Sequence, residues 1–416
     1  MIFKRTLNLS SVKRSAFLFG PRMTGKTFLL HHTFDNHFGV QRLPSDIEKQ
    51  IRSSVSGRKQ IATIKPQILK IDLMNPEVEL QLNQTPGLFW EEISAVSKGG
   101  FIIVDEIQRV PKLLDYVQRG IEELNLIFIL SGSSARKLKR GGANLLGGRA
   151  KDLKLHPLTH EELGNYFNIH QACQFGTLPK VSQHLAEKDI AEAKSLLRSY
   201  TTTYIKEEIQ AEALTRNVGA FLRFLPVAVQ SNAQVIEFAN ISRECSVPAS
   251  TVKEYYSILE ETLLGDFLWP WDRSERKKAR PKFYFFDCGV VRAVQNRLND
   301  PPTPDEIGFL FETWFIREIR RLRDYGNKDH EFSFWREGND EIDLLITGGH
   351  GPLLAFECKS GRETIKEKTV RAFRAKFPHV PLFIASLQDK VVRRLSSNVE
   401  ILPWNVALQK YQEQTT

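Results

Sequence analysis

Gly20-Pro21-Arg22-Met23-Thr24-Gly25-Lys26-Thr27 is the stretch of sequence that decides the fold of the N-terminal region. It matches the pattern GxxxxGK[ST], and it stands between an apolar run typical of a β-strand, Ala16–Phe19, and a helical run, Thr27–His32. Glycines let such a loop wrap, so that backbone N–H groups and a helix N-terminus face phosphates. We therefore expect residues 20–27 to bind ATP, with Lys26 neutralising the β- and γ-phosphates and Thr27 offering its hydroxyl to Mg²⁺.

A buried strand that ends in two acids supplies the second half of such a site. The apolar run at 101–104 leads directly into Asp105 and Glu106. Ligands of open parallel sheets lie outside the carboxyl ends of the strands. We therefore expect Asp105 to reach the Mg²⁺ shell and Glu106 to orient and activate water. The two acids predict ATP hydrolysis, and they disfavour a chance glycine turn at residues 20–27.

Two further residues are candidates for the γ-phosphate. The apolar run Leu126–Leu130 ends at Ser131, which is either a γ-phosphate sensor or a turn residue at a strand end. Arg149, within Leu146-Gly147-Gly148-Arg149, is either an arginine finger or part of a basic surface. Such a finger acts within its own chain or on a neighbouring copy, and the second case requires a homo-oligomer.

Several segments carry a family resemblance. They are, in the first half, GPRMTGKT (20–27), FIIVDEIQRVPKLLDYV (101–117), LSGSSARKL (130–138), LLGGRA (145–150) and HPLTHEEL (156–163). In this order they resemble prokaryotic AAA+ superfamily ATPases that carry a C-terminal domain of unknown function. PKFYFFDCGVV (281–291), GFLFETWFIREI (308–319), EIDLLI (341–346) and FECKSG (356–361) look like that C-terminal domain. The resemblance implies ATP binding and hydrolysis by Lys26, Thr27, Asp105 and Glu106.

The chain of 416 residues is long enough for two or three domains. Alternating β-rich and helical runs predict a P-loop AAA+ parallel sheet in residues 1–180, with an insertion at 41–66. Apolar residues at helical spacing predict a helical, winged-helix-like domain in residues 181–298. A long helix followed by β-rich runs predicts an α/β domain of the restriction-endonuclease-like kind in residues 299–416. The predicted fold class is thus multidomain α/β.

The middle part contains a candidate DNA-binding element. Residues 240–259 read as helix, tight turn and helix, with Ser250 placed to cap the second helix. Runs at 264–271 and 282–286 predict a β-wing, and the stretch Arg273–Lys282, with six bases and one acid, would form its tip. The second helix also carries acids that would repel DNA: Glu254, Glu260 and Glu261. DNA binding and purely structural packing both remain open.

The C-terminal part contains a candidate hydrolytic site. Asp343 lies in an alternating strand, and Glu357 and Lys359 share one face of a later strand. Asp343 and Glu357 would hold Mg²⁺, and Lys359 would stabilise a pentacovalent phosphate or activate water. Glu312, on the preceding helix, is a third acid. This set resembles the PD-(D/E)xK nuclease superfamily, and the alternatives are a nuclease-like fold kept for binding, or salt bridges between Lys359 and its acid neighbours.

Composition narrows the class of protein. Hydrophobic residues make up 41% and charged residues 26%, and no apolar run approaches the roughly 18 residues of a membrane span. The N-terminus has no secretory signal pattern, and four scattered cysteines give no zinc spacing, so we expect a cytoplasmic protein. The net charge of +9, with a basic run at Arg136–Arg140, suits a polyphosphate partner.

Two functions follow. The first is an ATPase that couples nucleotide binding and hydrolysis to the handling of DNA. Whether this protein also cleaves DNA is left open by the sequence. The second is a nucleotide-dependent switch that recognises a protein partner, in which the nuclease-like domain binds and does not cleave. Steep salt dependence of DNA binding would distinguish the first from the second.

Overall fold

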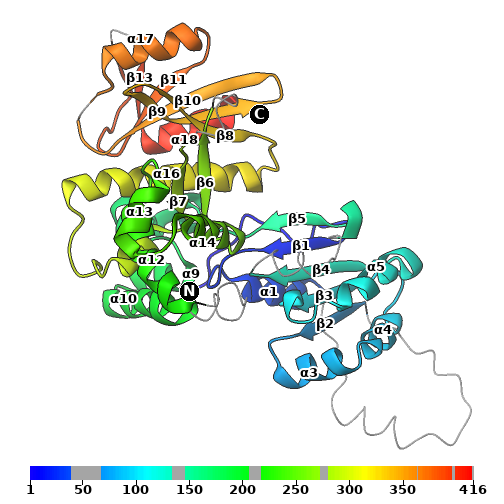
Figure 1. Cartoon of the computed structure of the whole chain (residues 1–416). Helices are drawn as coiled ribbons and strands as arrows, with labels where there is room; N and C mark the ends of the chain where they lie inside the picture. The colour runs from blue at the N-terminus through cyan, green and yellow to red at the C-terminus, as the bar shows by residue number, and fades with distance from the viewer. Residues whose placement is uncertain are drawn as a thin grey trace, which may run out of the picture. The chain divides into compact units, whose positions relative to one another are not determined.

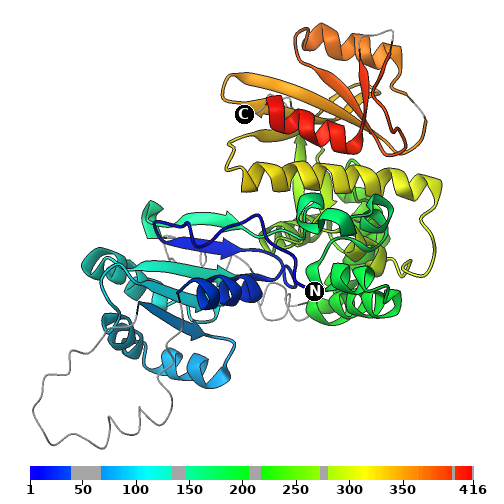
Figure 2. The same cartoon turned by 180° about the vertical axis from the view of Figure 1, so that it is seen from behind.

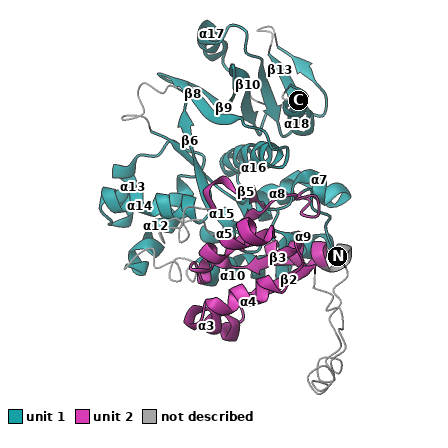
Figure 3. Cartoon of the chain, turned by 90° about the vertical axis from the view of Figure 1, so that its right-hand side faces the viewer, with its two compact units in different colours: residues 1–6, 21–24, 156–416 teal, residues 7–20, 25–155 magenta. Residues whose placement is uncertain are grey.

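The structure is a computed structural model that describes residues 1–38, 67–133, 146–205, 217–271, 280–362, 364–395 and 399–414 (Figure 1). These residues form two compact units. Unit 1 contains Met1–Thr6, Pro21–Thr24 and His156–Thr416, and unit 2 contains Leu7–Gly20 and Gly25–Leu155 (Figure 3). The predicted insertion at 41–66 and the basic run at 136–140 lie outside the described residues. The division into three domains stays a prediction.

Unit 2 is built on a parallel five-stranded sheet, as the sequence predicted. Its strands are β1 (Ala16–Phe19), β2 (Ile68–Asp72), β3 (Phe101–Asp105), β4 (Ile127–Gly132) and β5 (Lys151–Lys154), in the order β2-β3-β4-β1-β5. Buried, near-continuous apolar runs form β1, β3 and β4, which is typical of a parallel sheet covered on both faces. The sequence did not predict β5, because this edge strand reads Lys-Asp-Leu-Lys and buries little.

Helices cover both faces of this sheet. They are α1 (Lys26–Phe38), α3 (Pro76–Gln84), α4 (Gly87–Ser94), α5 (Leu113–Leu124) and the short 3₁₀ turns η1 (Ile107–Arg109) and η2 (Leu146–Gly148). Leu29 and Leu30 of α1 pack with Leu18, Ile103 and Ile129 on one face. Gly120 of α5 approaches Phe128 and Ile93 on the other face. The carboxyl ends of β1, β3 and β4 therefore meet at one edge of the sheet. The loop 20–27 follows β1, the turn η1 follows β3, and residue 133 follows β4.

The first part of unit 1 is helical. Its elements are α7 (His160–Leu163), η3 (Gly164–Tyr166), α8 (Ile169–Phe175), α9 (Pro179–Ala186), α10 (Ile190–Ser199), η4 (Tyr200–Tyr204), α12 (Val218–Gln230), α13 (Phe238–Cys245), α14 (Ala249–Glu261) and α15 (Cys288–Val294). Helices α13 and α14 follow one another through a turn with a left-handed Ser246. The predicted cap was wrong: α14 begins at Ala249, directly after Pro248, so Ser250 is its second residue and caps nothing.

The second part of unit 1 is a mixed sheet. Its strands are β6 (Gly265–Pro270), β7 (Lys282–Phe285), β8 (Glu331–Glu337), β9 (Asp340–Gly348), β10 (Gly351–Lys359), β11 (Leu382–Ser386), β12 (Arg393–Arg394) and β13 (Glu400–Pro403). The order is β12-β13-β11-β10-β9-β8-β6-β7. The antiparallel pair β6 and β7 extends this sheet, because Trp269 of β6 pairs with Ser333 of β8. The predicted wing strands therefore belong to the same sheet as the C-terminal strands.

Helices also lie on both faces of this second sheet (Figure 2). The long α16 (Pro304–Tyr325) and α18 (Trp404–Gln414) pack against Leu344 and Phe356, whereas α17 (Glu367–Lys376) packs against Ile342 and Leu345. Leu344 and Leu345, which are neighbours in β9, thus face different cores, as the period of a strand requires. Ile342 and Leu344 also lie in different cores although they are two residues apart, and the pairing of β9 with β8 shifts register at this point. Thr303 and Glu306 form a capping box that starts α16.

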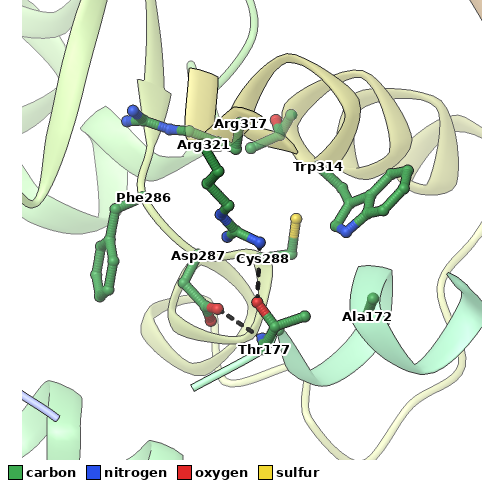
Figure 4. Close-up of a pocket in the computed structure, with 10 residues that line it drawn as sticks. Ala172, Thr177, Phe286, Asp287, Cys288, Trp314, Arg317 and Arg321 are labelled. Carbon is green, nitrogen blue, oxygen red and sulfur yellow. Dashed lines mark hydrogen bonds between the residues drawn. The ribbon is translucent and has the colours of Figure 1, made fainter. Parts of the chain in front are cut away.

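A buried polar joint holds α8, α15 and α16 together (Figure 4). Asp287 accepts hydrogen bonds from the N–H groups of Thr177 (2.8 Å) and Val290 (3.2 Å). Arg321 donates to the Thr177 hydroxyl at 3.1 Å and to Glu318 at 2.9 Å. Gly176 has a φ of +71°, and a Cβ there would lie 1.9 Å from an Asp287 oxygen. Only glycine fits this position, because both its conformation and its space exclude a side chain.

Candidate nucleotide site and carboxylate cluster

The loop after β1 folds back over its own start in unit 2. The Lys26 ammonium is buried and donates a hydrogen bond to the Gly20 carbonyl at 2.7 Å. Gly25 has a φ of +89°, which suits glycine, and Leu29 N–H donates to its carbonyl at 2.8 Å as α1 begins. The loop therefore leads directly into the N-terminus of a helix, which is the arrangement that favours phosphate.

The middle residues of the same loop belong to unit 1. The Thr24 hydroxyl donates to the Pro21 carbonyl at 2.8 Å, and Met23, with a φ of +63°, packs on the unit 1 core. The Arg22 guanidinium lies 5.9 Å from the centre of the Tyr204 ring. Their phosphate-binding role remains a prediction.

Three predicted site residues meet at the edge of the unit 2 sheet. The Thr27 hydroxyl donates to one oxygen of Asp105 at 2.7 Å. The Ser131 hydroxyl donates to the other oxygen, and it accepts the Glu106 N–H at 3.1 Å. The residues thus come from the loop, β3 and β4, as expected from strands whose ends align. A hydroxyl and a carboxylate side by side are oxygen ligands of the kind that Mg²⁺ prefers.

Gln108 also belongs to this network, although no sequence pattern predicted it. Its side-chain amide donates to a Glu106 carboxylate oxygen and, at 3.2 Å, to the Ser133 hydroxyl. Glu106 itself is left-handed, with a φ of +58°. Gly132 leaves room for this amide, because a Cβ at that position would lie 2.6 Å from Gln108 Oε1. In the sequence, the sign of this contact is the position of Gln108, a side chain that can donate a hydrogen bond, two residues after Glu106.

Arg149 lies elsewhere. Its guanidinium forms an ion pair with Glu122 of α5 at 2.7 Å, and the two side chains are 42% and 45% exposed. It also donates to the Leu146 carbonyl at 3.4 Å. The structure thus places Arg149 in a half-exposed pair outside the contacts among Thr27, Asp105 and Ser131, and its role as a finger stays a prediction.

The four predicted residues of the C-terminal site lie on α16, β9 and β10 in unit 1. Lys359 forms an ion pair with Glu357 at 2.8 Å, and the Cys358 N–H donates to Asp343 Oδ2 at 2.9 Å. A fifth residue, Lys282, joins Asp343 to Glu312, with its ammonium 3.2 Å and 3.0 Å from their oxygens. The residues therefore form one buried cluster.

The prediction that Lys282 lies at the tip of a basic wing was wrong. In the structure it is 3% exposed and also pairs with Glu341 at 2.8 Å. Lys282 and Tyr284 share one face of β7, and the Tyr284 hydroxyl donates to Glu312 at 2.5 Å. The remainder of the predicted tip, 272–279, lies outside the described residues. Lys282, Tyr284 and Glu341 were not predicted as members of the cluster.

Burial and mutual repulsion shift the acids of this cluster. Burial and the nearby Asp343 raise the pKa of Glu357 to about 8, against a smaller opposing effect of Lys359. Burial and Asp343 raise the pKa of Glu312 to about 7, opposed by Lys282 and Tyr284. Burial lowers the pKa of Lys282, but Glu312, Tyr284 and the other acids raise it well above its usual value.

One feature of the cluster favours metal binding and another argues against it. Glu357 Oε2 is buried and has no hydrogen-bond partner within the described parts of the chain, as a metal ligand would. Yet no group of three or more His, Cys, Asp or Glu residues among those that the structure describes is placed to hold a metal ion. The metal-binding role of Asp343 and Glu357 therefore stays a prediction.

Comparison with known families divides the chain into three matched stretches. Residues 12–164 match the model of an AAA domain. Residues 166–300 match a domain of unknown function (DUF8612), and residues 307–406 match another (DUF4143). A comparison with curated proteins gave no match. No helix in the described ranges is both apolar enough and long enough to cross a bilayer.

Solved structures with distant likeness include several replication proteins. The Aeropyrum pernix ORC1 protein in complex with DNA is 13% identical, with 69% of this chain and 87% of that chain covered and a TM-score of 0.32. The replication initiator DnaA bound to AMPPCP and single-stranded DNA is 13% identical, with 61% and 84% covered and a TM-score of 0.29. Scores this low do not establish a common fold. The parallel sheet, the loop geometry and the family match together make the N-terminal part of the chain similar to AAA+ ATPases.

Proposed function

We propose that the chain binds ATP with Mg²⁺ at residues 20–27 and hydrolyses it. The contact of Thr27 with Asp105 at 2.7 Å carries this proposal, because it joins the phosphate-binding loop to the acid that ends β3. Lys26 would neutralise the β- and γ-phosphates. Mg²⁺, when bound, would be held by Thr27 and Asp105 and would supply further neutralising charge. Measurement of phosphate release from ATP by the purified full chain, with and without Mg²⁺, tests this function.

Glu106 is the residue that would prepare the attacking water. Its backbone N–H donates to Ser131, which also contacts Asp105, and its carboxylate accepts the Gln108 amide. General bases of this kind act by accepting a proton or orienting water. Ser131 would report on the γ-phosphate, because its hydroxyl already connects Asp105 to the Glu106 backbone. Arg149 would serve as a finger only after leaving Glu122, within the chain or in a homo-oligomer.

Gln108 would hold the Glu106 carboxylate in position. Replacement of Gln108 by alanine removes the amide that donates to Glu106 and to Ser133. We expect kcat to fall by about tenfold or more, because a misplaced base loses part of its roughly 10²–10⁴-fold contribution. Nucleotide affinity should be unchanged, since Gln108 contacts neither Lys26 nor Thr27. Steady-state kinetics with separate determination of kcat and KM checks this split.

Gln118 provides a matched control. It is a glutamine of the same unit that also donates to a glutamate, Glu122 at 3.2 Å, but the pair is exposed on α5. Alanine at position 118 should leave kcat and KM unchanged, because Glu122 keeps its ion pair with Arg149 without this amide. Equal losses for Gln108→Ala and Gln118→Ala would mean that the effect is one of general stability and that Gln108 does not position Glu106.

The proposed task of the ATPase is the handling of DNA. Support comes from the net charge of +9 and from the arrangement of α13, α14, β6 and β7, a helix, turn and helix followed by an antiparallel strand pair. Lys253 and Ser250 are exposed on α14, together with the acids Glu254 and Glu261. Contacts with DNA phosphates would therefore come from Lys253 of α14 and also from basic residues outside α14.

Salt dependence separates DNA handling from the alternative function. We expect the full chain to bind duplex DNA at low salt and to lose affinity steeply as salt rises, by roughly 10³–10⁵-fold between about 50 and 200 mM for six to ten phosphate contacts. Fluorescence anisotropy at several salt concentrations measures the slope. Lack of binding at the lowest concentration would favour a nucleotide-dependent switch that recognises a protein partner.

The C-terminal cluster is the point on which the two functions differ most. Cleavage of DNA would require Asp343 and Glu357 to hold Mg²⁺, with Lys359 stabilising the pentacovalent phosphate. The convergence of these residues with Glu312 supports a nuclease-like arrangement. The ammonium of Lys282 between two of the acids favours the alternative in which the domain binds and does not cleave.

A further inference from the structure

We propose that the ammonium of Lys282 is the built-in cation of the C-terminal carboxylate cluster and takes the position that a divalent metal would need. The cluster consists of Glu312, Glu341, Asp343 and Glu357. This inference concerns unit 1 alone and does not depend on the proposed ATPase activity. It assigns to Lys282 a role that neither the wing nor the nuclease-like pattern contains.

Three carboxylates surround Lys282 Nζ. Carboxylate oxygens lie at 2.8 Å (Glu341), 3.0 Å (Glu312) and 3.2 Å (Asp343). Two of the three N–H groups of the ammonium donate hydrogen bonds, to Glu312 and Asp343, and Glu341 adds a third carboxylate as an ion pair. A divalent ion bound by the same oxygens would have to occupy the same space. Lys282 and a metal are therefore alternatives at this position.

Asp343 is already engaged on both sides. Its Oδ1 faces Lys282, and its Oδ2 accepts the Cys358 N–H at 2.9 Å. Glu357, the other predicted metal ligand, is paired through Oε1 with Lys359. A metal that used the free Oε2 of Glu357 would have to share Asp343 with the Lys282 ammonium, at a separation where two cations repel.

The backbone fixes Lys282 in this place. Lys282 pairs with Leu268 in the β6–β7 ladder and forms a bridge with Val235 on its other side. Next to it, the Pro281 carbonyl accepts the Ile236 N–H at 2.8 Å, and the Phe283 carbonyl accepts the Ala233 N–H at 2.9 Å. Withdrawal of the ammonium would thus require more than a rotamer change, because the strand is held from both edges.

Removal of the ammonium should turn the cluster into a metal site. As they stand, the three carboxylates are not placed to hold a metal ion. Lys282→Ala removes the ammonium between them, so that they can close on a divalent ion, and hard oxygen ligands of this kind bind Mg²⁺ and Mn²⁺. Lys359→Ala is the matched control, because Lys359 is also a lysine of the cluster but contacts Glu357 alone among the four acids. The probe is Mn²⁺ added to the nucleotide-free full chain and followed by isothermal titration calorimetry and by thermal unfolding.

The expected results are specific to each variant. The wild-type chain and Asp343→Asn should bind Mn²⁺ equally, because the cluster of the wild-type chain binds none. Lys282→Ala should gain one site and an Mn²⁺-dependent rise in Tm, Lys282→Ala/Asp343→Asn should lose both, and Lys359→Ala should gain neither. Any weak binding at Thr27 and Asp105 cancels in these comparisons, because all variants keep those residues.

Two results would overturn the proposal. One is a wild-type Mn²⁺ site that disappears in Asp343→Asn, which would show that metal and Lys282 coexist. The other is a folded Lys282→Ala chain, verified by circular dichroism, that gains no site. If Lys282→Ala does not fold, the comparison of wild type with Asp343→Asn still tests the proposal, because Mn²⁺ binding that depends on Asp343 in the wild type would overturn it without any change at position 282.

Discussion

Replacement of Lys26 by alanine is expected to abolish measurable ATP turnover. The Lys26 ammonium is buried and held against the Gly20 carbonyl at 2.7 Å, which places the charge at the start of the phosphate-binding loop. Loss of a single preorganised donor to developing charge costs about 10²–10³-fold in kcat, and a full positive charge that also contributes to binding should cost at least as much. Phosphate release measured at saturating MgATP, together with nucleotide affinity by calorimetry, checks both effects.

Lys98 supplies the control for this prediction. It is an exposed lysine of the same unit, between α4 and β3, and Lys98→Ala removes the same charge from the chain. Turnover by Lys98→Ala should match the wild type. Turnover by Lys26→Ala at the wild-type rate would refute the nucleotide site, and with it the ATPase proposal.

The parts of the fold that the sequence predicted best are those with strong local patterns. β1, β3 and β4 contain short apolar runs that are followed directly by Gly20, Asp105 and Ser131, so the position of these strands and their shared edge could be read from the sequence. β5 carries three charged residues in four positions, and it is a strand only because it pairs with β1. Such an edge strand has no pattern of its own to read.

The candidate sites show the same contrast. Residues two apart on a strand share a face, so Glu357 and Lys359 could be placed together, and the structure confirms their contact. Lys282 stands in a run of bases, which locally is typical of a solvated loop. Its burial is decided by Glu312 and Asp343, which lie 30 and 61 residues away in the sequence. Gln108 was missed for a related reason, since its partner Ser133 follows another strand.

Replacement of Glu106 by glutamine is expected to separate nucleotide binding from hydrolysis. The substitution keeps the size of the side chain and an oxygen that can accept the Gln108 amide, but it removes the charge and the basicity. Turnover should fall by about 10²–10⁴-fold, the usual contribution of a positioned general base. Thr27, Asp105 and Lys26 are untouched, so the affinity for MgATP should remain within about twofold, well under the tenfold that 1.4 kcal/mol represents.

The contrast with Lys26→Ala makes this test sharp, because that variant should lose nucleotide affinity as well as turnover. Glu91→Gln is the control for charge, since Glu91 is an exposed glutamate of α4 in the same unit, and it should hydrolyse ATP at the wild-type rate. A rapid mix of Glu106→Gln with excess MgATP, followed by separation of the bound nucleotide, should recover ATP. Recovery of ADP at the wild-type rate would mean that another group activates the water, and the acid at the end of β3 that could then do so is Asp105.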